Sequence, residues 1–475
     1  MKNNNQAEQE PSHYDIVIIG SGPAGQKAAI QAAKLGKRVA LIEKSAKLGG
    51  SSLHTGTIPS KSLRETVVNL DMLYHRTHGI EISVPNNIKT EELMFRKKVV
   101  IQEQENSLKR NLSKNNVDLY QGTPCFVSAN IIEVSTEELC KEILISEIFI
   151  IATGSRPSHP SWFDANIPGV FDSDTILTLK RLPTQITVIG SGVIGCEYAC
   201  IFAKLGIRVH LISRHQSILP FLDQEISEHL TFRMRNQRIT MRQGESVDKI
   251  EQQDDHLMVH LVSGNKVTSP VVLVAAGRRS NIEGLGLEKI DIIPEDMGRL
   301  SVNENYQTNL PNIYAVGDVI GFPGLASTAM IQARIAVLHA FNQLQSEKMP
   351  TRLPIGIWTI PAIAMIGETE ANLIEKKVSY EIGIAHFREV VRAHIMGYQE
   401  GILKLLFCPT SLKVLGVHII GPQAAELIHL GQSVMHFNGD IKYFLNSAFN
   451  YPTLDEAYQI AAFNGLNRLG LSIES

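Results

Sequence analysis

YDIVIIGSGPAGQKAAIQAAKLGKRVALIE, residues 14–43, is the stretch of sequence from which the fold can be worked out. It begins with a β-branched run, passes through a glycine-rich turn and continues as an alanine-rich stretch with helical character over residues 26–35. A second β-branched run over residues 38–42 ends at Glu43. The succession of strand, tight turn, helix and strand is typical of a dinucleotide-binding unit.

The residues of this turn explain how it would bind a dinucleotide. Glycines at positions 20, 22 and 25 permit a tight turn and let the backbone approach a pyrophosphate at the helix N-terminus. Glu43 lies 18 positions after Gly25 (25 to 43) and can accept hydrogen bonds from a ribose. A glycine turn alone is common, but the strand, the helix and the acid around it make the pattern specific. We therefore predict a dinucleotide site formed by Gly20, Gly22, Gly25, Glu43 and Lys44.

The same pattern occurs a second time in the chain, which is its most informative internal feature. Residues 186–189 form a β-branched run, GSGVIG follows at 190–195, and a helix-like stretch over 196–205 leads to another strand at 208–212. The chain therefore has two predicted dinucleotide sites, and the second is expected to use Gly190, Gly192, Gly195 and, at the end of the domain, Gly277.

The two sites differ at the position that reads the ribose. The residue 18 positions after Gly195 (195 to 213) is Ser213, and it is followed by Arg214 and His215. An acid there would repel a 2′-phosphate, whereas a neutral serine followed by a guanidinium favours one. We expect Ser213, Arg214 and His215 to bind NADP while still admitting NAD. The alternative is that Arg214 is a solvated turn residue.

Length, composition and charge exclude several classes of function. A chain of 475 residues with 44 % apolar content can form about three globular domains. Its net charge of −3 gives no general attraction to nucleic acid or to an anionic membrane, so small molecules or a second copy are the expected partners. Residues 1–13 are polar and no run of about 18 apolar residues follows, which predicts a cytoplasmic protein without export or membrane spanning.

The cysteines do not indicate a disulfide framework or a metal site. There are five of them, which is an odd number and few for this length: Cys125, Cys140, Cys196, Cys200 and Cys408. Cys196 and Cys200 would lie one helical turn apart, but no histidine or further cysteine accompanies them. We expect both to be buried in a core and predict no metal site.

GGSSLHTGTIPSKSLRE, residues 49–65, resembles the active-site segment of the flavin-dependent pyridine nucleotide-disulfide oxidoreductases. In that family two cysteines of this segment face the flavin. The matching positions here are Ser52 and Thr57, and neither hydroxyl can carry electrons as a thiol–disulfide pair does. The resemblance therefore implies a flavin whose electrons go to an acceptor other than an internal disulfide.

Further segments of the family pattern imply that the flavin is FAD. Residues 152–154 resemble its ATG segment, and residues 313–318 resemble the strand whose aspartate, Asp318, bonds the ribityl chain. The resemblance also places Lys61 against the flavin, where its charge would stabilise the reduced ring. With the first glycine turn, the FAD site is expected to include Gly50, Ser51, Lys61, Ala152, Thr153, Gly154 and Asp318.

Glu197 matches the family position whose carboxylate pairs with the flavin-site lysine, so Lys61 and Glu197 are the expected catalytic residues. Each has a less specific interpretation. Lys61 can be a solvated lysine at the start of a helix, and Glu197 can be an acid favoured by a helix N-terminus. For Glu197, a position favoured by the helix N-terminus is compatible with an ion pair to Lys61.

The resemblance also predicts the domain organisation: an α/β chain with two Rossmann-like domains and a C-terminal α+β dimerisation domain. The FAD domain is expected at 13–157 and 278–348, the NAD(P) domain at 158–277 and the dimerisation domain at 349–475. The last domain is expected to have four short strands, at 362–366, 380–385, 402–407 and 414–420, and two helical segments, at 424–437 and 454–469, but it has no glycine fingerprint. Its resemblance to a dimerisation domain implies a homodimer or a higher homo-oligomer.

The end of the chain departs from the disulfide reductases once more. In those enzymes a histidine precedes a proline and a glutamate lies five residues on, serving as acid–base for the thiols. Tyr451 stands in the place of the histidine while Glu456 is kept, and a tyrosine with an ordinary pKa near 10 is a poor proton shuttle at neutral pH. The thiols and their base are therefore absent together.

This joint absence resembles the transhydrogenase branch of the family, over essentially the whole chain after residue 12. It implies a ping-pong exchange of hydride between NADPH and NAD⁺ through N5 of FAD, with no protein proton relay. One alternative is an NAD(P)H oxidase or diaphorase that uses oxygen or a quinone. Another is a redox-silent FAD-binding protein, against which the intact Lys61, Glu197 and both glycine turns argue.

Overall fold

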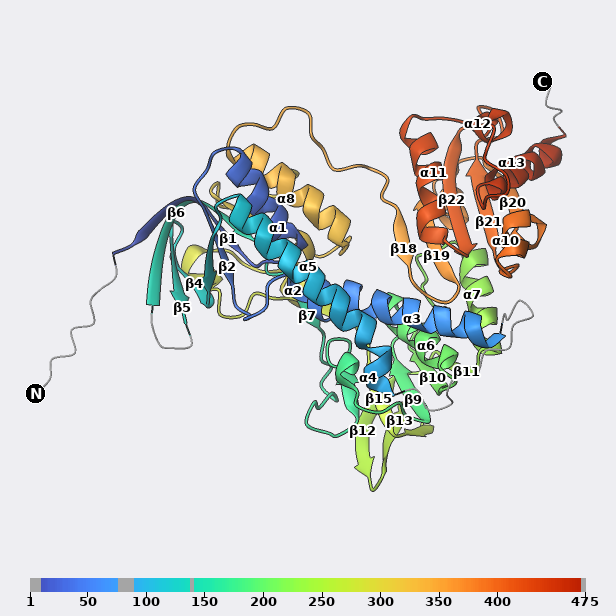
Figure 1. Cartoon of the computed structure of the whole chain (residues 1–475), viewed down its shortest axis with the longest axis horizontal. Helices are drawn as coiled ribbons and strands as arrows, with labels where there is room; N and C mark the ends of the chain where they lie inside the picture. Colours follow the sequence, from blue (N-terminus) through green and yellow to red (C-terminus); the bar gives the residue numbers. More distant parts are fainter. Residues whose placement is uncertain (1–9, 76–88, 137–140, 471–475) are drawn as a thin grey trace, which may run out of the picture.

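A computed structural model of the chain describes residues 10–75, 89–136 and 141–470. It contains two units built on parallel strands and a C-terminal unit built on an antiparallel sheet (Figure 1). The predicted α/β fold class with two Rossmann-like units and a C-terminal α+β unit is confirmed. Cys140 and most of the polar N-terminal run lie outside the described residues.

The first unit is a seven-stranded sheet in which β1 and β6 are central. The strands in order are β3 (Asp118–Gln121), β2 (Val39–Glu43), β1 (Ser12–Ile19), β6 (Lys141–Ile151), β5 (Ile131–Ser135) and β4 (Thr123–Ser128), with β17 (Ile313–Ala315) also pairing with β6. Strands β3, β2, β1, β6 and β17 run parallel, and β4 to β6 form an antiparallel meander.

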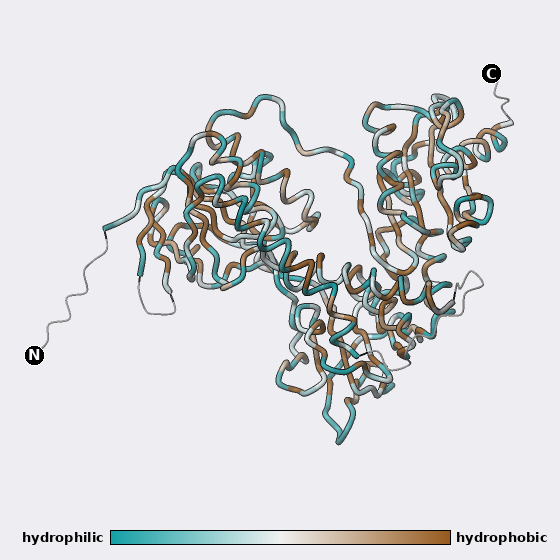
Figure 2. The backbone as a smooth tube through the Cα atoms, viewed as in Figure 1, coloured by the Kyte–Doolittle hydropathy of each residue, from teal (hydrophilic) through white to brown (hydrophobic). Residues whose placement is uncertain are grey.

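Strand β1 is apolar at every position from 16 to 19 because both faces of the sheet are covered. Ile16 and Ile18 pack into the core beneath α1 (Pro23–Lys34) and α8 (Ala326–Ala340). Val17 and Ile19 face a second cluster on the other side of the sheet. In Figure 2 these strands form a block of mostly hydrophobic (brown) residues beside the helices.

Both fingerprint helices begin earlier than the sequence predicted. Helix α1 begins at Pro23 rather than at residue 26, because Gly22 is its N-cap and proline suits the first helical position. Helix α6 (Val193–Lys204) begins at Val193 rather than at residue 196, with Gly192 as its N-cap. The glycine turns are therefore part of the helix N-termini, where unpaired N–H groups can meet a phosphate.

The second unit repeats this plan with a smaller sheet. Its strands are all parallel, in the order β11 (Ile239–Gln243), β10 (Arg208–Ser213), β9 (Gln185–Ile189), β15 (Val271–Val274) and β8 (Val170–Asp172). Helix α6 covers one face, where the buried side chains of Cys196 and Cys200 join the core as expected. The other face is covered by the meander β12 (Val247–Gln253), β13 (His256–Leu261) and β14 (Lys266–Ser269).

The third unit is a five-stranded antiparallel sheet that shares a hydrophobic core with C-terminal helices (Figure 1). The strand order is β18 (Ile355–Ile357), β19 (Ala362–Gly367), β22 (Val414–Gly421), β21 (Ile402–Phe407) and β20 (Glu381–His386). Its helices are α9 (Glu370–Glu375), α10 (Val391–Ile395), α11 (Ala424–His436), α12 (Lys442–Asn446) and α13 (Glu456–Leu469).

The remaining elements either pack on one of the three units or connect them. Strands β7 (Ser155–Pro157) and β16 (Arg278–Ser280) pair where the chain leaves and re-enters the first unit. Helix α3 (Thr57–His75) crosses the centre of the molecule in Figure 1. The others are α2 (Gly50–His54), α4 (Thr90–Leu93), α5 (Phe95–Lys114), α7 (Gln224–Asn236), η1 (Ile176–Thr178), η2 (Leu287–Ile290), η3 (Asp296–Gly298), η4 (Gly317–Ile320) and η5 (Phe387–Glu389). The predicted domain boundaries remain predictions.

A buried lysine joins the second and third units. Lys404 on β21 is fully buried, and its Nζ lies 2.8 Å from Asp223 Oδ1 and 2.9 Å from Glu225 Oε2, and also contacts Glu370. Asp223 caps α7 of the second unit, so the contact anchors that helix to the C-terminal sheet.

Among the described residues, no helix is both long enough and apolar enough to cross a membrane.

Candidate flavin and nucleotide site

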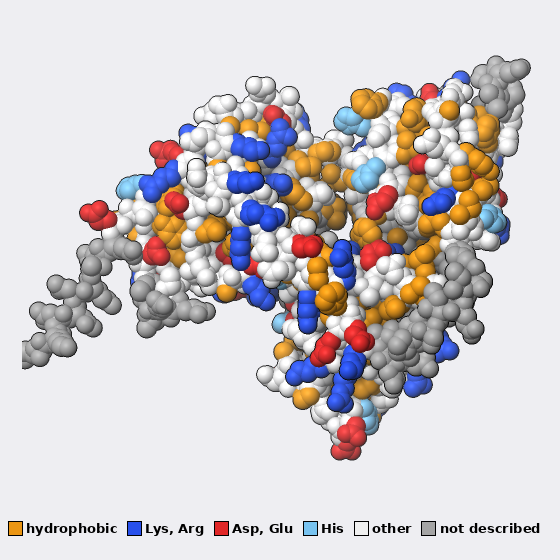
Figure 3. Space-filling view, viewed as in Figure 1, with side chains coloured by type: hydrophobic (Ala, Val, Ile, Leu, Met, Phe, Trp, Pro, Cys, Tyr) orange, Lys and Arg blue, Asp and Glu red, His pale blue; other side chains and the backbone are white. Residues whose placement is uncertain are grey.

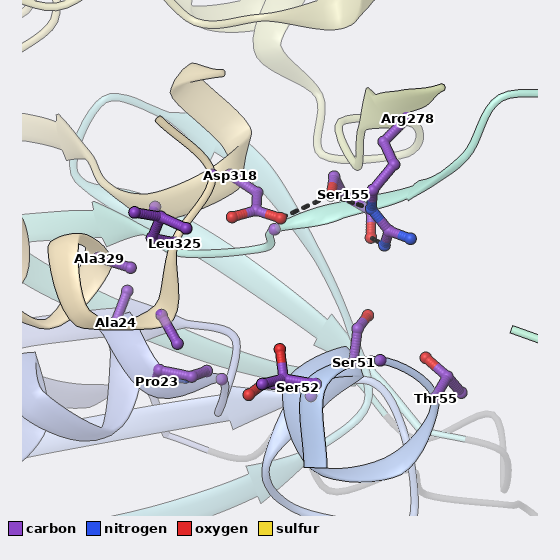
Figure 4. A pocket seen from close by; sticks show the side chains of 18 of the residues that line it. Pro23, Ala24, Ser51, Ser52, Thr55, Ser155, Arg278, Asp318, Leu325 and Ala329 are labelled. Carbon is purple, nitrogen blue, oxygen red and sulfur yellow. Dashed lines mark hydrogen bonds between the residues drawn. The ribbon is translucent and has the colours of Figure 1, made fainter. Parts of the chain in front are cut away.

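A cleft of about 2430 Å³ runs between the three units, and its lining includes residues from all of them. In Figure 3 the molecule is visibly indented between the first and third units. Figure 4 looks into the part lined by α1, α2, α8 and the segments around Ser155 and Asp318. Most of the residues predicted to bind FAD line this cleft.

The first glycine turn has the geometry that a close pyrophosphate requires. A Cβ on Gly25 would lie 1.8 Å from the Gly20 oxygen, and one on Gly20, whose φ is +104°, would lie 2.4 Å from the Ala152 oxygen. These two positions therefore admit only glycine. Nothing lies within 4 Å of a Cβ on Gly22, so that position is open to a ligand in the cleft.

Glu43, at the end of β2, stabilises this turn through hydrogen bonds. Its Oε2 accepts hydrogen bonds from Ser21 N at 3.0 Å and Ser21 Oγ at 2.5 Å, and its Oε1 accepts from Ser45 N at 2.9 Å. Ser21 Oγ in turn accepts from Gly49 N at 2.8 Å. Glu43 and Lys44 both line the cleft, so the carboxylate lies where a ribose would have to bind.

Helix α2 and the start of helix α3 line the cleft with hydroxyl groups. A Cβ on Gly50 would lie 3.0 Å from Gly22 Cα, so α2 packs directly on the glycine turn. Ser51, Ser52 and Thr57 line the cleft (Figure 4 shows the two serines). None of the cysteines among the described residues lines it. In the part of the chain that the structure describes, the cleft therefore holds no thiol.

Three polar side chains form a chain of hydrogen bonds across the upper part of Figure 4. Ser155 Oγ donates to Asp318 Oδ2 at 2.8 Å and accepts from Arg278 Nε at 2.8 Å. Arg278 also lies 3.5 Å from Asp174, whose pKa is raised by burial and lowered again in part by that guanidinium. Asp318 was predicted from the sequence, whereas Ser155, Arg278 and Asp174 were not.

Lys61 and Glu197 form the expected ion pair across the cleft wall. The carboxylate side chain is 5 % exposed, and the ammonium side chain, at 23 %, faces the cleft. The other carboxylate oxygen, Oε1, accepts a hydrogen bond from Trp358 N at 2.8 Å. Sequence reasoning missed Trp358, which lies in the third unit, so the pair and its backbone donor join helix α3 to the second and third units.

A buried hydroxyl also lines the cleft without a partner. Tyr198 follows Glu197 on α6, is 3 % exposed, and its OH has no hydrogen-bond partner among the described residues. Burial raises its pKa, and the nearby carboxylates of Glu197 and Asp174 add to the effect, so the group is a neutral donor. With the open position at Gly22 and the carboxylates at both ends, these residues fit an elongated polar ligand such as FAD.

The second glycine turn repeats the geometry of the first. A Cβ on Gly195 would lie 1.8 Å from the Gly190 oxygen, and nothing lies within 4 Å of one on Gly192. Of this turn and its helix, Val193, Ile194, Glu197 and Tyr198 line the cleft, while Gly190 and Gly192 are not among the lining residues. A nucleotide bound to this turn would therefore reach the cleft by way of Val193 and Ile194.

At the end of β10, the side chain of Ser213 is buried and forms hydrogen bonds within the turn. It is 2 % exposed, its Oγ lies 2.6 Å from Ser191 Oγ, and it accepts a hydrogen bond from His215 N at 3.0 Å. Arg214 is exposed, and its Nε donates to His215 Nε2 at 3.2 Å. Ser213 thus shapes the turn that presents Arg214, and the contact of these residues with a nucleotide remains a prediction.

The other predicted residues fall into two groups. Ala152, Thr153 and Gly154 line the cleft, and Thr153 is tied to the re-entering chain by its Oγ1, which donates to Asn281 O at 2.7 Å. Gly277 is not among the lining residues and has a φ of +113°, immediately before β16. Tyr451 is 70 % exposed and is not among the cleft-lining residues either.

The sequence matches two family models. Residues 14–333 match the model described as pyridine nucleotide-disulphide oxidoreductase, and residues 353–462 match the dimerisation domain of the same family.

Curated relatives and solved structures are similar over nearly the whole chain. The chain is 44 % identical to the soluble pyridine nucleotide transhydrogenase of Marinomonas sp. (strain MWYL1) over 96 % of this chain and 99 % of the relative. It is 42 % identical to the protein of that name from Pseudomonas aeruginosa (strain LESB58), with the same coverage. The solved HOCl-induced flavoprotein disulfide reductase RclA from Escherichia coli superposes with a TM-score of 0.87 at 25 % identity, over 95 % of this chain and 99 % of that one.

Proposed function

Because this chain belongs to the pyridine nucleotide-disulphide oxidoreductase family, we propose that it is an FAD-dependent transhydrogenase that exchanges hydride between NADPH and NAD⁺. The chain is a homologue of soluble pyridine nucleotide transhydrogenases. The proposal adds the cofactor, the two substrates and the residues that bind them.

One observation carries the proposal: the cleft has the flavin-site ion pair of the family but, among its described residues, no redox thiol. Ser52 and Thr57 line the cleft near Lys61, and the described cysteines all lie elsewhere. A hydroxyl cannot store the two electrons that a thiol–disulfide pair stores. Electrons that reach a flavin here must therefore leave directly to a small molecule that enters the cleft.

The residues that would hold FAD follow the cleft from end to end. Glu43 would accept from the adenosine ribose, the N–H groups at the start of α1 would meet the pyrophosphate, and Asp318 would accept from the ribityl chain. When bound, FAD supplies the two-electron chemistry, accepting hydride from a reduced nicotinamide and returning it to an oxidised one. The protein contributes position, charge and exclusion of water.

Lys61 would stabilise the negative charge that builds up on the reduced ring. Its ammonium is only partly exposed, so its field is screened less than that of a surface lysine. Glu197 keeps the ammonium against the wall, and Trp358 N holds the carboxylate from behind. Hydride transfer needs no proton from the protein, which is compatible with a tyrosine at position 451.

The second glycine turn would bind the nicotinamide nucleotides one at a time. The turn at Ser213 presents Arg214 to solvent at the carboxyl end of β10, where a 2′-phosphate would lie. NAD lacks that phosphate, but nothing in the turn rejects its free hydroxyl. We propose that both nucleotides bind here and that NADP binds more tightly.

We further propose that the chain forms a homodimer through its C-terminal unit, which matches the family's dimerisation domain, and that it works in the cytoplasm. Neither point is needed for the chemistry. Size-exclusion chromatography with light scattering would test the first, and fractionation of the source cell would test the second.

The direct test of the function is transfer between nucleotides in the absence of oxygen. NADPH and a thionicotinamide analogue of NAD⁺ are mixed with the FAD-loaded protein, and the reduced analogue is followed by its own absorbance. We expect catalytic transfer that needs FAD. If no hydride is transferred to the analogue, but NADPH is oxidised once oxygen or a quinone is added, the protein is an oxidase or a diaphorase instead.

A further inference from the structure

Arg64 is a buried arginine on helix α3 that no part of the proposed chemistry uses. It lies one helical turn after Lys61, and the whole residue is 8 % exposed. A guanidinium is costly to bury unless its donors are paired. Its carboxylate partner is the adjacent Glu65, whose side chain is 55 % exposed and lies at the surface. The reason for burying Arg64 must therefore be sought in its other contacts.

Those contacts go to one short segment of the third unit, residues 358–360, which we call the strap. Arg64 Nε donates to Trp358 O at 3.1 Å and to Thr359 O at 3.2 Å, and Nη2 donates to Thr359 O at 3.1 Å. The guanidinium carbon also lies 5.5 Å from the centre of the Trp358 ring. A forked donor on two consecutive carbonyls fixes both the position and the rotation of the strap.

The strap reaches the flavin-site ion pair through its backbone. Trp358, whose carbonyl Arg64 holds, donates its N–H to Glu197 Oε1 at 2.8 Å, and Glu197 pairs with Lys61. Because Lys61 and Arg64 belong to the same helix, the contacts close a ring: Lys61 to Glu197, Glu197 to Trp358, Trp358 to Arg64. Each member of such a ring is positioned by two others.

We infer that Arg64 is a positioning residue for the flavin site, which holds the strap so that Trp358 N meets Glu197 and Glu197 holds Lys61 at the cleft. The inference rests on the proposed function, because it presumes a flavin beside Lys61. Without Arg64 the strap can shift, and Glu197 loses its backbone donor. The carboxylate then offsets the positive charge of Lys61 more fully. The ammonium therefore stabilises negative charge in the cleft less.

Two substitutions test this inference. Arg64→Met keeps much of the length and removes every donor, whereas Arg64→Lys keeps the charge but offers no fork. We expect Arg64→Met to slow flavin reduction by NADPH about tenfold and to change the NADPH KM less than twofold. The flavin midpoint potential should fall by about 30 mV, the equivalent of tenfold for a two-electron couple. Arg64→Lys should lie between this variant and the parent protein in each measurement.

A fluorescence measurement tests the structural half of the inference without FAD. The chain has two tryptophans, so Trp162→Phe leaves Trp358 as the only one. In that background Arg64→Met should shift the Trp358 emission to longer wavelength, because the strap is released towards water. The matched control is Lys204→Met, which breaks the 3.0 Å Lys204–Asp71 contact between helices α6 and α3 without touching the strap. It should change neither emission nor potential.

A double-mutant cycle decides whether Arg64 acts through Glu197. If it does, Arg64→Met should change the potential and the reduction rate much less in a Glu197→Gln background than in the parent protein, since the shared path is already cut. Additive effects would overturn the inference, as would an unchanged potential in both Arg64 variants. If the parent protein binds no FAD, the proposed function fails. If the parent protein binds FAD and its flavin is reduced by NADPH, but the Arg64 variants have the same reduction rate and potential, only the role of Arg64 fails.

Discussion

Replacing Arg214 by alanine should separate the two nucleotides. Arg214 is exposed at the carboxyl end of β10, and its Nε donates to His215 Nε2 at 3.2 Å, which leaves its terminal nitrogens available to a ligand. The turn beneath it is held by Ser213, whose Oγ is engaged with Ser191 and His215. The substitution therefore removes the guanidinium and leaves the turn in place.

The size of the effect follows from the strength of a hydrogen bond between a guanidinium and a phosphate. A hydrogen bond to a charged group contributes about 1.5 to 3 kcal/mol, which corresponds to roughly tenfold to a hundredfold. Arg214 is exposed, so screening by salt places the expected decrease in kcat/KM for NADPH near tenfold at physiological ionic strength. The value for NADH should change less than twofold, because NADH has no 2′-phosphate. The difference should shrink in about 1 M salt, where the screening length is about 3 Å.

Steady-state kinetics with both reduced nucleotides, at low and high salt, would measure these values. Arg208→Ala is a matched control, since Arg208 is exposed on the same strand but at its opposite end, about 20 Å away at roughly 3.3 Å per residue. Equal losses with NADH and NADPH in Arg214→Ala would show that Arg214 is scaffold. A loss in Arg208→Ala as large as in Arg214→Ala would show only a general effect of net charge.

Four further outcomes are expected. Lys61→Ala should slow flavin reduction about tenfold or more while changing nucleotide affinity little, and an unchanged stopped-flow rate would remove its proposed role. Gly25→Ala should abolish FAD binding, whereas Gly195→Ala should retain FAD but lose the reduction of FAD by NADPH. In each turn the new Cβ would lie 1.8 Å from a backbone oxygen. Absorbance spectra of the purified proteins before and after NADPH would distinguish the two variants. Hydrogen bonds from neighbouring hydroxyls lower the pKa of Cys408 to about 6, so its alkylation by iodoacetamide should rise as the pH increases through about 6 and level off at neutral pH, and a midpoint at the ordinary thiol value near 8.5 would contradict this. Lipoamide and oxidised glutathione should not be turned over, because no described residue of the cleft is a thiol; measurable flavin-dependent reduction of either disulfide would contradict this expectation.

The parts of the fold that follow from local geometry could be predicted from the sequence. Gly20 and Gly25 are required because a Cβ at either place would collide with the backbone, and such requirements leave a readable spacing in the chain. The four strands expected in the C-terminal unit agree with β19 to β22 to within about one residue, since each is a compact apolar run. The helix starts were misplaced by three residues because the glycine turn itself serves as the N-cap.

The contacts between units could not be predicted, because nothing in the sequence connects their members. Trp358 lies 161 residues from Glu197, and its contribution is a backbone N–H, which every residue except proline has. Ser155 and Arg278 meet only because β7 and β16 pair at the junction of two units. The resemblance predicted the Lys61–Glu197 pair, but the strap behind it and the burial of Arg64 are visible only in three dimensions.

The measurement that tests the central claim most directly is a pair of half-reactions followed under strict exclusion of oxygen. The FAD-loaded protein is first mixed with one equivalent of NADPH and then with NAD⁺, and the flavin absorbance is recorded throughout. A cleft that has no thiol among its described residues predicts full bleaching in the first step, with no long-wavelength band from a thiolate beside the flavin. It predicts full recovery in the second step, with one NADH formed per flavin. A flavin that stays reduced in the presence of NAD⁺ and recovers only when oxygen or a quinone is added would contradict the claim.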